Sequence, residues 1–320
     1  MLKKLKLDFA HFLYASSERV FLQLNKFLGR GKKPLPSKCI TPQFDSLSNL
    51  PPKSVQSRVK LFFFFLQILF LPLSSDPSLE KVSLAGTDKP VKLTLSVVLG
   101  NEADNYLKPF LEDARHYVTD VVIIDDATTD NTIQICKEKL QGIPTTIVRN
   151  ECSKFSNEFE LRKQQWEETV KTAPDWILFL DADQIFEKKF KQQVKTLIQA
   201  QDVDVYCFRL YDFWDESHYR EDAYWRAHLC TRPFLIRYKP GIEYKWKETP
   251  QHCGSFPLTI FGFRMKNSEL RLKHYGWAKK EHRVAKYERY QRLDPGAVYG
   301  WKEQYESILD ENPRLVKWVE

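Results

Sequence analysis

Glycine, paired cysteines and long apolar runs are all scarce in this sequence. Only 11 of 320 residues are glycine, which argues against a fold that depends on glycine-rich loops. The six cysteines form no CxxC pair and show no zinc-like spacing, so we expect free thiols in a reducing compartment. The apolar run LFFFFLQILFLPL at 61–73 is shorter than the about 20 residues that a membrane-spanning helix needs.

The chain does have the composition of a folded protein. Hydrophobic residues make up 42% and charged residues 28%, which excludes general disorder, collagen-like repeats and a disulfide-dense mini-protein. Its 22 Phe, 14 Tyr and 8 Trp offer surfaces on which sugar or base rings could stack. The length exceeds the about 100 to 200 residues usual for one domain, so we expect one large domain with appendages or two domains.

Positive charge is concentrated at the amino-terminal end. Residues 1–60 carry 12 Lys and Arg against 3 Asp and Glu, a net charge of +9, whereas the remaining 260 residues sum to −2. This distribution fits a membrane surface or a tail-binding partner better than nucleic acid, so we expect no nucleic-acid partner. The lysines at positions 3, 4 and 6 are followed by no signal-peptide core, which predicts a cytoplasmic protein.

The amino-terminal third divides into two segments. Residues 1–30 predict a basic amphipathic helical segment, because apolar side chains recur there at helical spacing. Residues 31–90 predict a Pro- and Ser-rich linker that contains the Phe-rich run 61–73. Two interpretations stay open for residues 1–75: peripheral contact with anionic lipid at the inner face of the cell membrane, or packing on the folded body.

From about residue 90, short apolar runs alternate with helical stretches, which is the pattern of an α/β layered sheet. Strand-like runs cover 93–99, 121–124, 146–148 and 176–180, and helix-like stretches cover 103–117, 131–140 and 157–172. Strands joined by single helices run parallel, and ligands bind at the carboxyl ends of such strands. Polar residues directly after each strand are therefore the first candidates for a site.

Acidic and amide side chains follow the predicted strands. They are Asn101 and Glu102, then Asp125, Asp126 and Asp130, then Arg149 and Asn150, then Asp181 and Asp183. Such a cluster would repel itself without a cation or a polar ligand, although Asp130 could simply cap a helix. Asp181 and Asp183 follow the apolar run WILFL at two-residue spacing, so one Mg²⁺ or Mn²⁺ could touch both. A surface turn with two solvated aspartates is the alternative.

Residues 92 to about 290 resemble a family 2 glycosyltransferase with the GT-A fold. The segment IIDDATTDNT is similar to the family's VDDGSTDGT, and WILFLDADQ stands in the place of the family's metal-binding DXD. The resemblance implies a mostly parallel sheet flanked by helices over 91–290, to which we add a helical amino-terminal extension and a helical carboxyl-terminal segment at 291–320. Two positions depart from the family pattern: Ala127 replaces a glycine, and Gln184 stands where relatives often have an acid.

The resemblance also implies roles for individual residues. Asp126, with Asp125, would contact the base or ribose of a nucleotide-sugar. Asp181 would bind the donor ribose and, with Asp183, the Mn²⁺ or Mg²⁺ on the diphosphate. The other donor-binding candidates are Asn101, Glu102 and Arg162, of which Arg162 matches an arginine that the family often places before the DXD strand. A helix-surface arginine is the alternative for Arg162.

An inverting enzyme of this type needs a general base that takes the proton of the acceptor hydroxyl. Glu248 in KWKETPQHCG is the first candidate, because the family generally supplies its base after the DXD and before the carboxyl-terminal helices. Asp215 in YDFWDES is the second candidate. A solvated loop glutamate is the alternative for Glu248. Further carboxylates in this region are Asp212, Glu221 and Asp222.

The segment LKHYGW and the helix-like EHRVAKYERYQRL resemble a carboxyl-terminal pattern of the same subgroup. A neutral imidazole at His274 could complete the metal shell or meet the diphosphate, with a structural histidine as the alternative. Four basic residues here could lie near the phosphates or on a solvated helix face: Lys279, Lys280, Arg283 and Lys286.

An aromatic and basic stretch lies between the strand-like runs YCFRLYDF and LCTRPFLIRY. It contains Trp214, His218, Tyr219, Arg220, Tyr224, Trp225 and His228. Aromatic faces pack on sugar rings while His and Arg bond to hydroxyls, so this stretch is the candidate acceptor site. An antiparallel hairpin with buried aromatics is the alternative.

These features together predict an inverting, metal-dependent, hexosyltransferase-like enzyme. It would move a sugar from a nucleotide-sugar to a glycan, lipid-linked or other hydroxyl acceptor, in cell-envelope or surface polysaccharide synthesis. One alternative is a catalytically silent GT-A scaffold or membrane-associated binding protein, against which the intact Asp126, Asp181 and Asp183 speak. A haloacid-dehalogenase-like phosphatase would have Thr or Val where Gln184 stands, and its DxD would lie near the start of the domain, whereas three β/α units precede Asp181 here.

Overall fold

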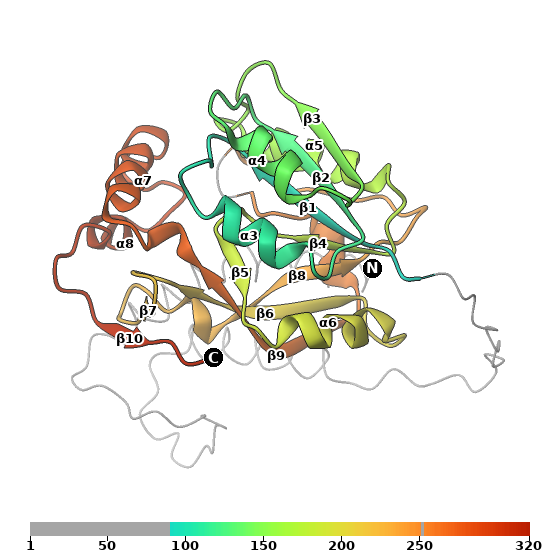
Figure 1. Ribbon diagram of the computed structural model, residues 1–320. Coiled ribbons are helices and arrows are strands. Elements are labelled where there is room, and N and C mark those ends of the chain that lie inside the picture. Colours follow the sequence, from blue (N-terminus) through green and yellow to red (C-terminus); the bar gives the residue numbers. More distant parts are fainter. Residues whose placement is uncertain (1–89, 251–252) are drawn as a thin grey trace, which may run out of the picture. The chain divides into compact units, whose positions relative to one another are not determined.

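The computed structural model describes residues 90–250 and 253–320 (Figure 1). The two segments expected within residues 1–89 lie outside this part of the chain. Ten strands are present in the described residues: β1 Leu93–Leu99, β2 Asp120–Asp125, β3 Thr145–Arg149, β4 Trp176–Phe179, β5 Gln184–Phe186, β6 Val205–Asp212, β7 His218–Arg220, β8 Thr231–Arg237, β9 Met265–His274 and β10 Leu315–Lys317. The α-helices there are α3 Leu107–Ala114, α4 Thr132–Lys139, α5 Glu158–Val170, α6 Phe190–Gln199, α7 Lys280–Leu293 and α8 Lys302–Ser307.

Eight of the strands form one sheet in the order β3-β2-β1-β4-β8-β6-β9-β5. The pairs among β3, β2, β1 and β4 are parallel, and so is β6 with β9, whereas β8 and β5 pair antiparallel with their neighbours. Four of the seven pairings are therefore parallel, which confirms the prediction of a mostly parallel sheet flanked by helices. The helix between each pair of early strands carries the chain back to the start of the next strand.

Strand alternation decides which helix covers which face of the sheet. Along β1, Leu93, Leu95, Val97 and Leu99 belong to one core cluster, which also contains buried residues of α3, α4 and α6. The intervening Ser96 faces the other side, where its hydroxyl bonds to Thr169 of α5. A second cluster on that side joins Trp166 of α5 to Ile177 and Phe179 of β4. The sheet thus lies between two helical layers.

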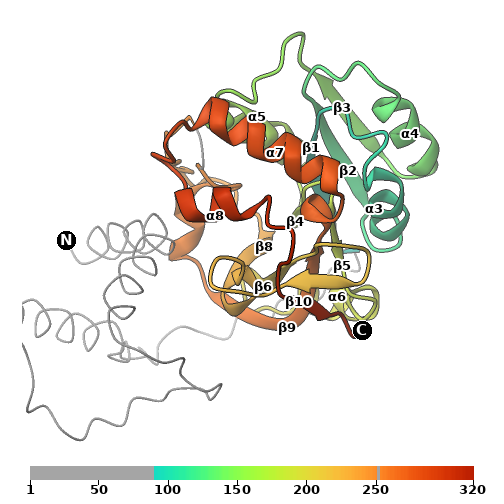
Figure 2. The same ribbon diagram turned by 90° about the vertical axis from the view of Figure 1, so that its left-hand side faces the viewer.

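The carboxyl-terminal segment packs through a third cluster of aromatic residues. Trp214, Trp225 and Trp277 are buried there against Tyr305 and Ile308, which lie in and just after α8. Residues 291–320 contain helix α8 and also strand β10, which pairs antiparallel with β7 in a separate two-stranded sheet. This packing brings α7 against α8 (Figure 2).

Two properties of the described residues bear on the sequence expectations. No helix between residues 90 and 320, outside the gap at 251–252, is long and apolar enough to cross a membrane. The cysteines at 136, 152, 207, 230 and 253 are free thiols, as expected, while Cys39 lies in the part that the structure does not describe.

Candidate functional site

The acidic motifs lie at one edge of the sheet, as the strand order requires. β2 and β4 are the two neighbours of β1, and all three run parallel. The amide of Asp126 donates to the Leu99 carbonyl (2.8 Å), and the amide of Leu180 donates to the Ser96 carbonyl (3.4 Å). Two strand spacings therefore separate the chain at Asp126 from the chain at Asp181, about 10 Å.

Asp125 and Asp126 have different partners, although they are adjacent in the sequence. The buried Asp125 carboxylate accepts from the backbone and hydroxyl of Thr128 and from Arg149 (2.8 Å). Its oxygens are committed to holding the turn after β2. In that turn Ala127 adopts φ 61°, a left-handed conformation that favours glycine. The family motif has a glycine at this position.

The Asp126 carboxylate organises the loop that follows β3. One oxygen accepts from the side-chain amide of Asn150 and the backbone of Lys154, both at 2.9 Å, and the other accepts from the Ser153 hydroxyl at 2.6 Å. Asn150 in turn accepts from Gln164 of α5 at 2.8 Å. Asp126 therefore connects the end of β2 to α5, which also carries Arg162.

Asn101 and Glu102 follow β1, the strand that lies between β2 and β4, which precede Asp126 and Asp181, respectively. Asn101 accepts from the backbone amide of Thr129 at 2.8 Å. The Glu102 carboxylate accepts from Asn105, and burial together with the charges of Asp183 and Asp181 raises its pKa. Asp130 accepts from the amides of Ala103 and Thr132, which is the capping role given as its alternative.

Arg162 lies inside the molecule rather than on a helix surface. Its guanidinium donates to Asp181 (3.0 Å) and to Gln165 (3.0 Å), and its side chain is 12% exposed. Gln184 donates to the second Asp181 oxygen at 3.2 Å and accepts from the Asp181 backbone at 3.0 Å. The amide side chain that departs from the family pattern thus holds Asp181 in place.

Asp183 belongs to a separate charged cluster with His274 and Lys286. One carboxylate oxygen lies 3.5 Å from His274 Nε2 and 3.6 Å from Lys286 Nζ. The other oxygen, Oδ1, is buried and has no hydrogen-bond partner. Burial opposes ionisation, but the charges of His274 and Lys286 hold the pKa of Asp183 well below its usual range. Strand pairing explains the meeting, because β5 begins directly after Asp183 and its Gln184 pairs with His274.

Asp212 orients His274 from the far side of the imidazole. His274 Nδ1 lies 2.7 Å from the Asp212 carboxylate, and the two residues pair across β6 and β9. Burial opposes the charged imidazole, but Asp183 and Asp212 raise the pKa of His274 to about 9. Asp212 was considered only as a base in the sequence. The sequence feature that could have predicted its contact with His274 is that each of the two residues ends a strand.

The Asp183 cluster fits a divalent cation with few protein ligands. A Cβ on the buried Gly276 would lie 2.5 Å from Asp183 Oδ2 and 2.6 Å from His274 Nε2, and closer still to Lys286 Nζ. A carboxylate with an unpartnered oxygen and an imidazole oriented by a second carboxylate are a suitable donor pair once a cation displaces the imidazole proton, because solvent and phosphate oxygens can complete the shell. No group of three or more His, Cys, Asp or Glu able to hold a metal occurs in the described ranges.

The basic residues around α7 separate into different environments. Lys279 donates to the Asp104 carbonyl at 2.8 Å, and Arg283 donates to the carbonyls of Trp214 (3.0 Å) and Trp277 (2.5 Å). Arg289 lies 5.0 Å from the ring of Phe155, in the loop that Asp126 organises. Helix α7 and the residue before it therefore contact the loop after β1 at one end and the loop after β3 at the other. Between these contacts, Lys286 of α7 lies beside Asp183.

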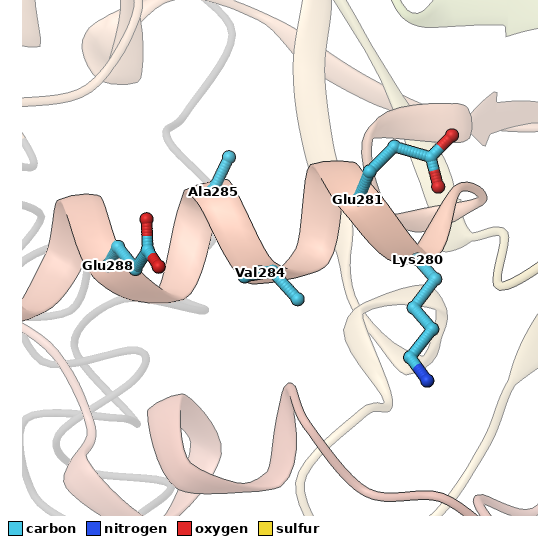
Figure 3. Close-up of a pocket in the computed structure, with 5 residues that line it drawn as sticks. All are labelled: Lys280, Glu281, Val284, Ala285 and Glu288. Carbon is cyan, nitrogen blue, oxygen red and sulfur yellow. The ribbon is translucent and has the colours of Figure 1, made fainter.

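A shallow hollow of about 460 Å³ lies along α7 (Figure 3). Its lining comes from the exposed side of the helix: Lys280, Glu281, Val284, Ala285 and Glu288. Successive residues of an α-helix are about 100° apart, which puts Lys286 on the opposite side. The hollow is therefore separate from the Asp183 cluster.

The two candidate general bases, Asp215 and Glu248, differ in the hydrogen bonds that their carboxylate oxygens accept. Asp215 accepts from the amides of Ser217 (2.7 Å) and His218 (2.8 Å), and it contacts the His218 imidazole. Burial opposes ionisation, but these bonds lower the pKa of Asp215. Glu248 is exposed in the irregular segment between β8 and β9. That segment meets α5, where Trp246 packs on Trp166 and the Glu158 amide bonds to the Pro250 carbonyl.

The aromatic stretch expected to bind an acceptor is largely buried. Trp214 and Trp225 are core residues, and the Arg220 guanidinium between them is 1% exposed. Arg220 forms ion pairs with Asp222 and Asp310 and donates to the Ser307 carbonyl. These contacts overturn the expectation for Trp214, Arg220 and Trp225 and agree with the alternative of buried aromatics. The reason is that the carboxyl-terminal segment covers them.

Comparisons with known proteins identify the family of this chain. The family model described as glycosyl transferase family 2 matches residues 96–269. Uncharacterized proteins of Mycobacterium tuberculosis and Mycobacterium bovis are each 22% identical over 222 residues, covering 67% of this chain. The chain spans about half the length of these curated relatives, 54%.

Two matches among solved structures are the following. Staphylococcus aureus TarS 1-349 in complex with UDP matches with a TM-score of 0.40 and 15% identity, covering 68% of this chain and 70% of that one. A mannosyltransferase from Pyrobaculum calidifontis in complex with GDP-Man and Mn²⁺ matches with a TM-score of 0.40 and 13% identity, covering 81% and 74%. The family model covers more than half of the chain and includes the two acidic motifs at the sheet edge, so this chain belongs to glycosyl transferase family 2.

Proposed function

We propose that this chain is an inverting, metal-dependent glycosyltransferase that uses a nucleotide-sugar donor. The observation that carries the proposal is the buried, unpartnered oxygen of Asp183 in a cluster with His274 and Lys286. A buried carboxylate oxygen without a hydrogen bond is costly unless a ligand meets it. Membership of the family supports a glycosyl donor as that ligand.

Asp183 and His274 would hold Mn²⁺ or Mg²⁺, with Asp212 keeping the imidazole in position. When bound, the cation supplies positive charge to the diphosphate as it leaves. Asp181, which Arg162 and Gln184 hold, would meet the ribose, and Asp126 with its loop would meet the base. These groups would thus contact the donor over a span of about 10 Å at the sheet edge.

The transfer itself is a single displacement. The acceptor hydroxyl oxygen forms a bond to the anomeric carbon while the bond from that carbon to the diphosphate oxygen breaks, and the electron pair leaves with the diphosphate. The hydroxyl proton passes to a carboxylate. Glu248 suits this role better than Asp215, because the Asp215 oxygens already accept from two backbone amides and the His218 ring.

The acceptor and cellular role belong to this proposal as well. A glycan, a lipid-linked or another hydroxyl acceptor in cell-envelope or surface polysaccharide synthesis would fit a hexosyltransferase-like member of the family. A cytoplasmic protein with peripheral attachment through residues 1–75 would meet such an acceptor at the membrane. The basic composition of residues 1–60 supports that attachment.

A thermal-shift screen tests donor binding directly. UDP-, GDP- and dTDP-sugars would be compared with a CMP-sugar, which lacks a diphosphate, with and without Mn²⁺ on the wild-type chain, on D183A and on D202A. Asp202 is a matched control, because it is an exposed aspartate that precedes β6. The site lies at the other end of that strand, where Asp212 is the last residue. We expect one nucleotide class to stabilise wild type and D202A in Mn²⁺ but not D183A. Stabilisation of D183A equal to that of wild type would overturn the role of Asp183.

Turnover is the second test, because it separates an enzyme from a silent scaffold. With the nucleotide-sugar selected by the screen, we expect wild type to release nucleoside diphosphate in Mn²⁺. E248Q should bind the donor normally while its rate falls by about 10² to 10⁴, the usual contribution of a general base. Donor binding without any release by wild type would instead support the scaffold. An unchanged rate in E248Q would return Asp215 to consideration, tested with D215N.

A further inference from the structure

Lys286 differs from the other basic residues near α7 in where its charge lies. Lys279 and Arg283 donate to backbone carbonyls, and Lys280 is exposed on the opposite side of the helix. The Lys286 ammonium instead points to the site, 3.6 Å from Asp183 Oδ2 and 4.5 Å from the ring centre of Trp277. The sequence alone did not distinguish among the four.

The contacts of Lys286 place its ammonium beside Asp183 and leave its hydrogen-bonding capacity unused. The side chain is 20% exposed, and the face of Trp277 supports its charge. A separation of 3.6 Å is longer than an ordinary N–H···O hydrogen bond, so Asp183 does not use up the three N–H donors. Within residues 90–250 and 253–320, no hydrogen bond of ordinary length forms at this ammonium.

The Lys286 ammonium lies among several carboxylates. Glu102, Asp181, Asp183 and Asp212 are four carboxylates around the place where a diphosphate would lie. Arg162 is committed to Asp181, and His274 is held between Asp183 and Asp212. A diphosphate carries negative charge into this environment, so it needs a cation that can turn toward its oxygens. Lys286 is such a cation.

Gly276 provides the space in which this happens. A Cβ at this position would collide with Lys286 Nζ and would lie 2.5 Å from Asp183 Oδ2. Because the position has no side chain, the lysine, the carboxylate and His274 Nε2 can converge on one small volume. The three head groups come from α7, from the turn before β5 and from the end of β9, respectively.

We propose that Lys286 is a diphosphate-binding residue whose ammonium turns from Asp183 to the phosphate oxygens of the donor. This inference rests on the proposed function and adds one consequence to it. Because part of the positive charge at the site is covalently attached, nucleoside diphosphates retain measurable affinity without a divalent cation. The contribution of Lys286 is specific to the diphosphate and leaves recognition of the nucleoside unchanged.

Calorimetric titration of the full chain tests this. UDP or GDP, as selected by the donor screen, and the matching nucleoside would be titrated into wild type, K286M and K280M, in Mn²⁺ and in EDTA. We expect K286M to bind the diphosphate about 10- to 100-fold more weakly than wild type in EDTA, the loss of one charge-assisted hydrogen bond. Nucleoside affinity should be equal in all three proteins, and K280M should match wild type throughout.

Each other outcome has a defined meaning. Equal diphosphate affinity in wild type and K286M, or no wild-type binding in EDTA despite binding in Mn²⁺, overturns the role of Lys286 and leaves the proposed function intact. Absence of wild-type binding to any nucleoside diphosphate overturns both. If K286M has a lowered unfolding midpoint, titrations at a temperature where K286M is fully folded decide the question: a loss confined to the diphosphate, with nucleoside affinity equal to wild type, supports the proposal, and an equal loss of both affinities overturns it.

Discussion

At the scale of single residues, the two aspartates of each acidic motif have different partners. Asp125 holds a turn and Asp126 holds a loop, while Asp181 is bound by two side chains and Asp183 keeps a free oxygen. The motifs themselves were predictable from the sequence, because they follow apolar strands. Which member of a pair faces a ligand was not predictable, because that depends on partners such as Arg149, Arg162 and Lys286, which lie in other elements of the chain.

Asp212 offers a test of positioning as distinct from metal ligation. The change D212N keeps the size of the side chain but weakens its bond to His274 Nδ1. Loss of an outer partner of a metal-binding imidazole usually costs about 10- to 100-fold in metal affinity, so Mn²⁺ binding measured by electron paramagnetic resonance should weaken by that factor. D202N serves as the control. Unchanged Mn²⁺ affinity in D212N would show that the imidazole needs no such support.

At the scale of elements, the sequence predicts the first half of the sheet well and the second half poorly. The predicted runs at 93–99, 121–124, 146–148 and 176–180 correspond to β1 to β4, because local apolar runs and single helices determine them. Strand β5, directly after Asp183, and its pairing with β9 were not predicted. That pairing joins residues about ninety positions apart, and no local pattern reports it.

The junction of β4, β8, β6 and β9 contains a buried carboxylate with a structural role. Asp204, 1% exposed, accepts from Arg264 (2.9 Å) and Lys239 (2.8 Å), and Arg237 lies 3.7 Å away. These bonds, against the effect of burial, hold the pKa of Asp204 well below its usual range. A carboxyl group whose pKa is lower in the folded state stabilises the fold at pH values above its unfolded pKa.

The expected result is a pH-dependent loss of stability in D204N. At pH 7 its free energy of unfolding, measured with urea, should be lower than that of wild type by about 1 to 3 kcal/mol. The difference should narrow as the pH falls below about 4, where the carboxyl group of the unfolded wild-type chain becomes protonated and the native carboxylate loses its advantage. A constant difference from pH 7 to pH 3 would contradict this account of the junction.

At the scale of the whole molecule, the described residues bring acidic motifs far apart in sequence to one edge of the sheet, with α7 passing across it (Figure 2). The convergence follows from parallel β/α topology and could be predicted from the strand pattern. The place of α7 could not, because it depends on the aromatic cluster around Trp214, Trp225 and Trp277. The sequence suggested Trp214 and Trp225 as part of an acceptor surface instead.

Attachment of the amino-terminal region to membranes is a prediction for the whole chain. Liposome flotation would compare the full chain with a variant lacking residues 1–75, on neutral vesicles and on vesicles rich in anionic lipid. We expect the full chain to float only with anionic vesicles and to be released by high salt, because the interaction depends on the lysines and arginines of residues 1–60. The same behaviour of both proteins would argue that residues 1–75 have no membrane role.

The central claim is that Asp183 and His274 form the place where a cation meets the diphosphate of the donor. Crystals grown with Mn²⁺ and the nucleoside diphosphate chosen by the screen test it most directly, through the anomalous scattering of manganese. We predict a manganese peak within coordinating distance of Asp183 and His274 Nε2, with the diphosphate beside it and the base toward Asp126. A manganese and nucleotide site elsewhere on the molecule, with the Asp183 oxygen still unpartnered, would contradict the account.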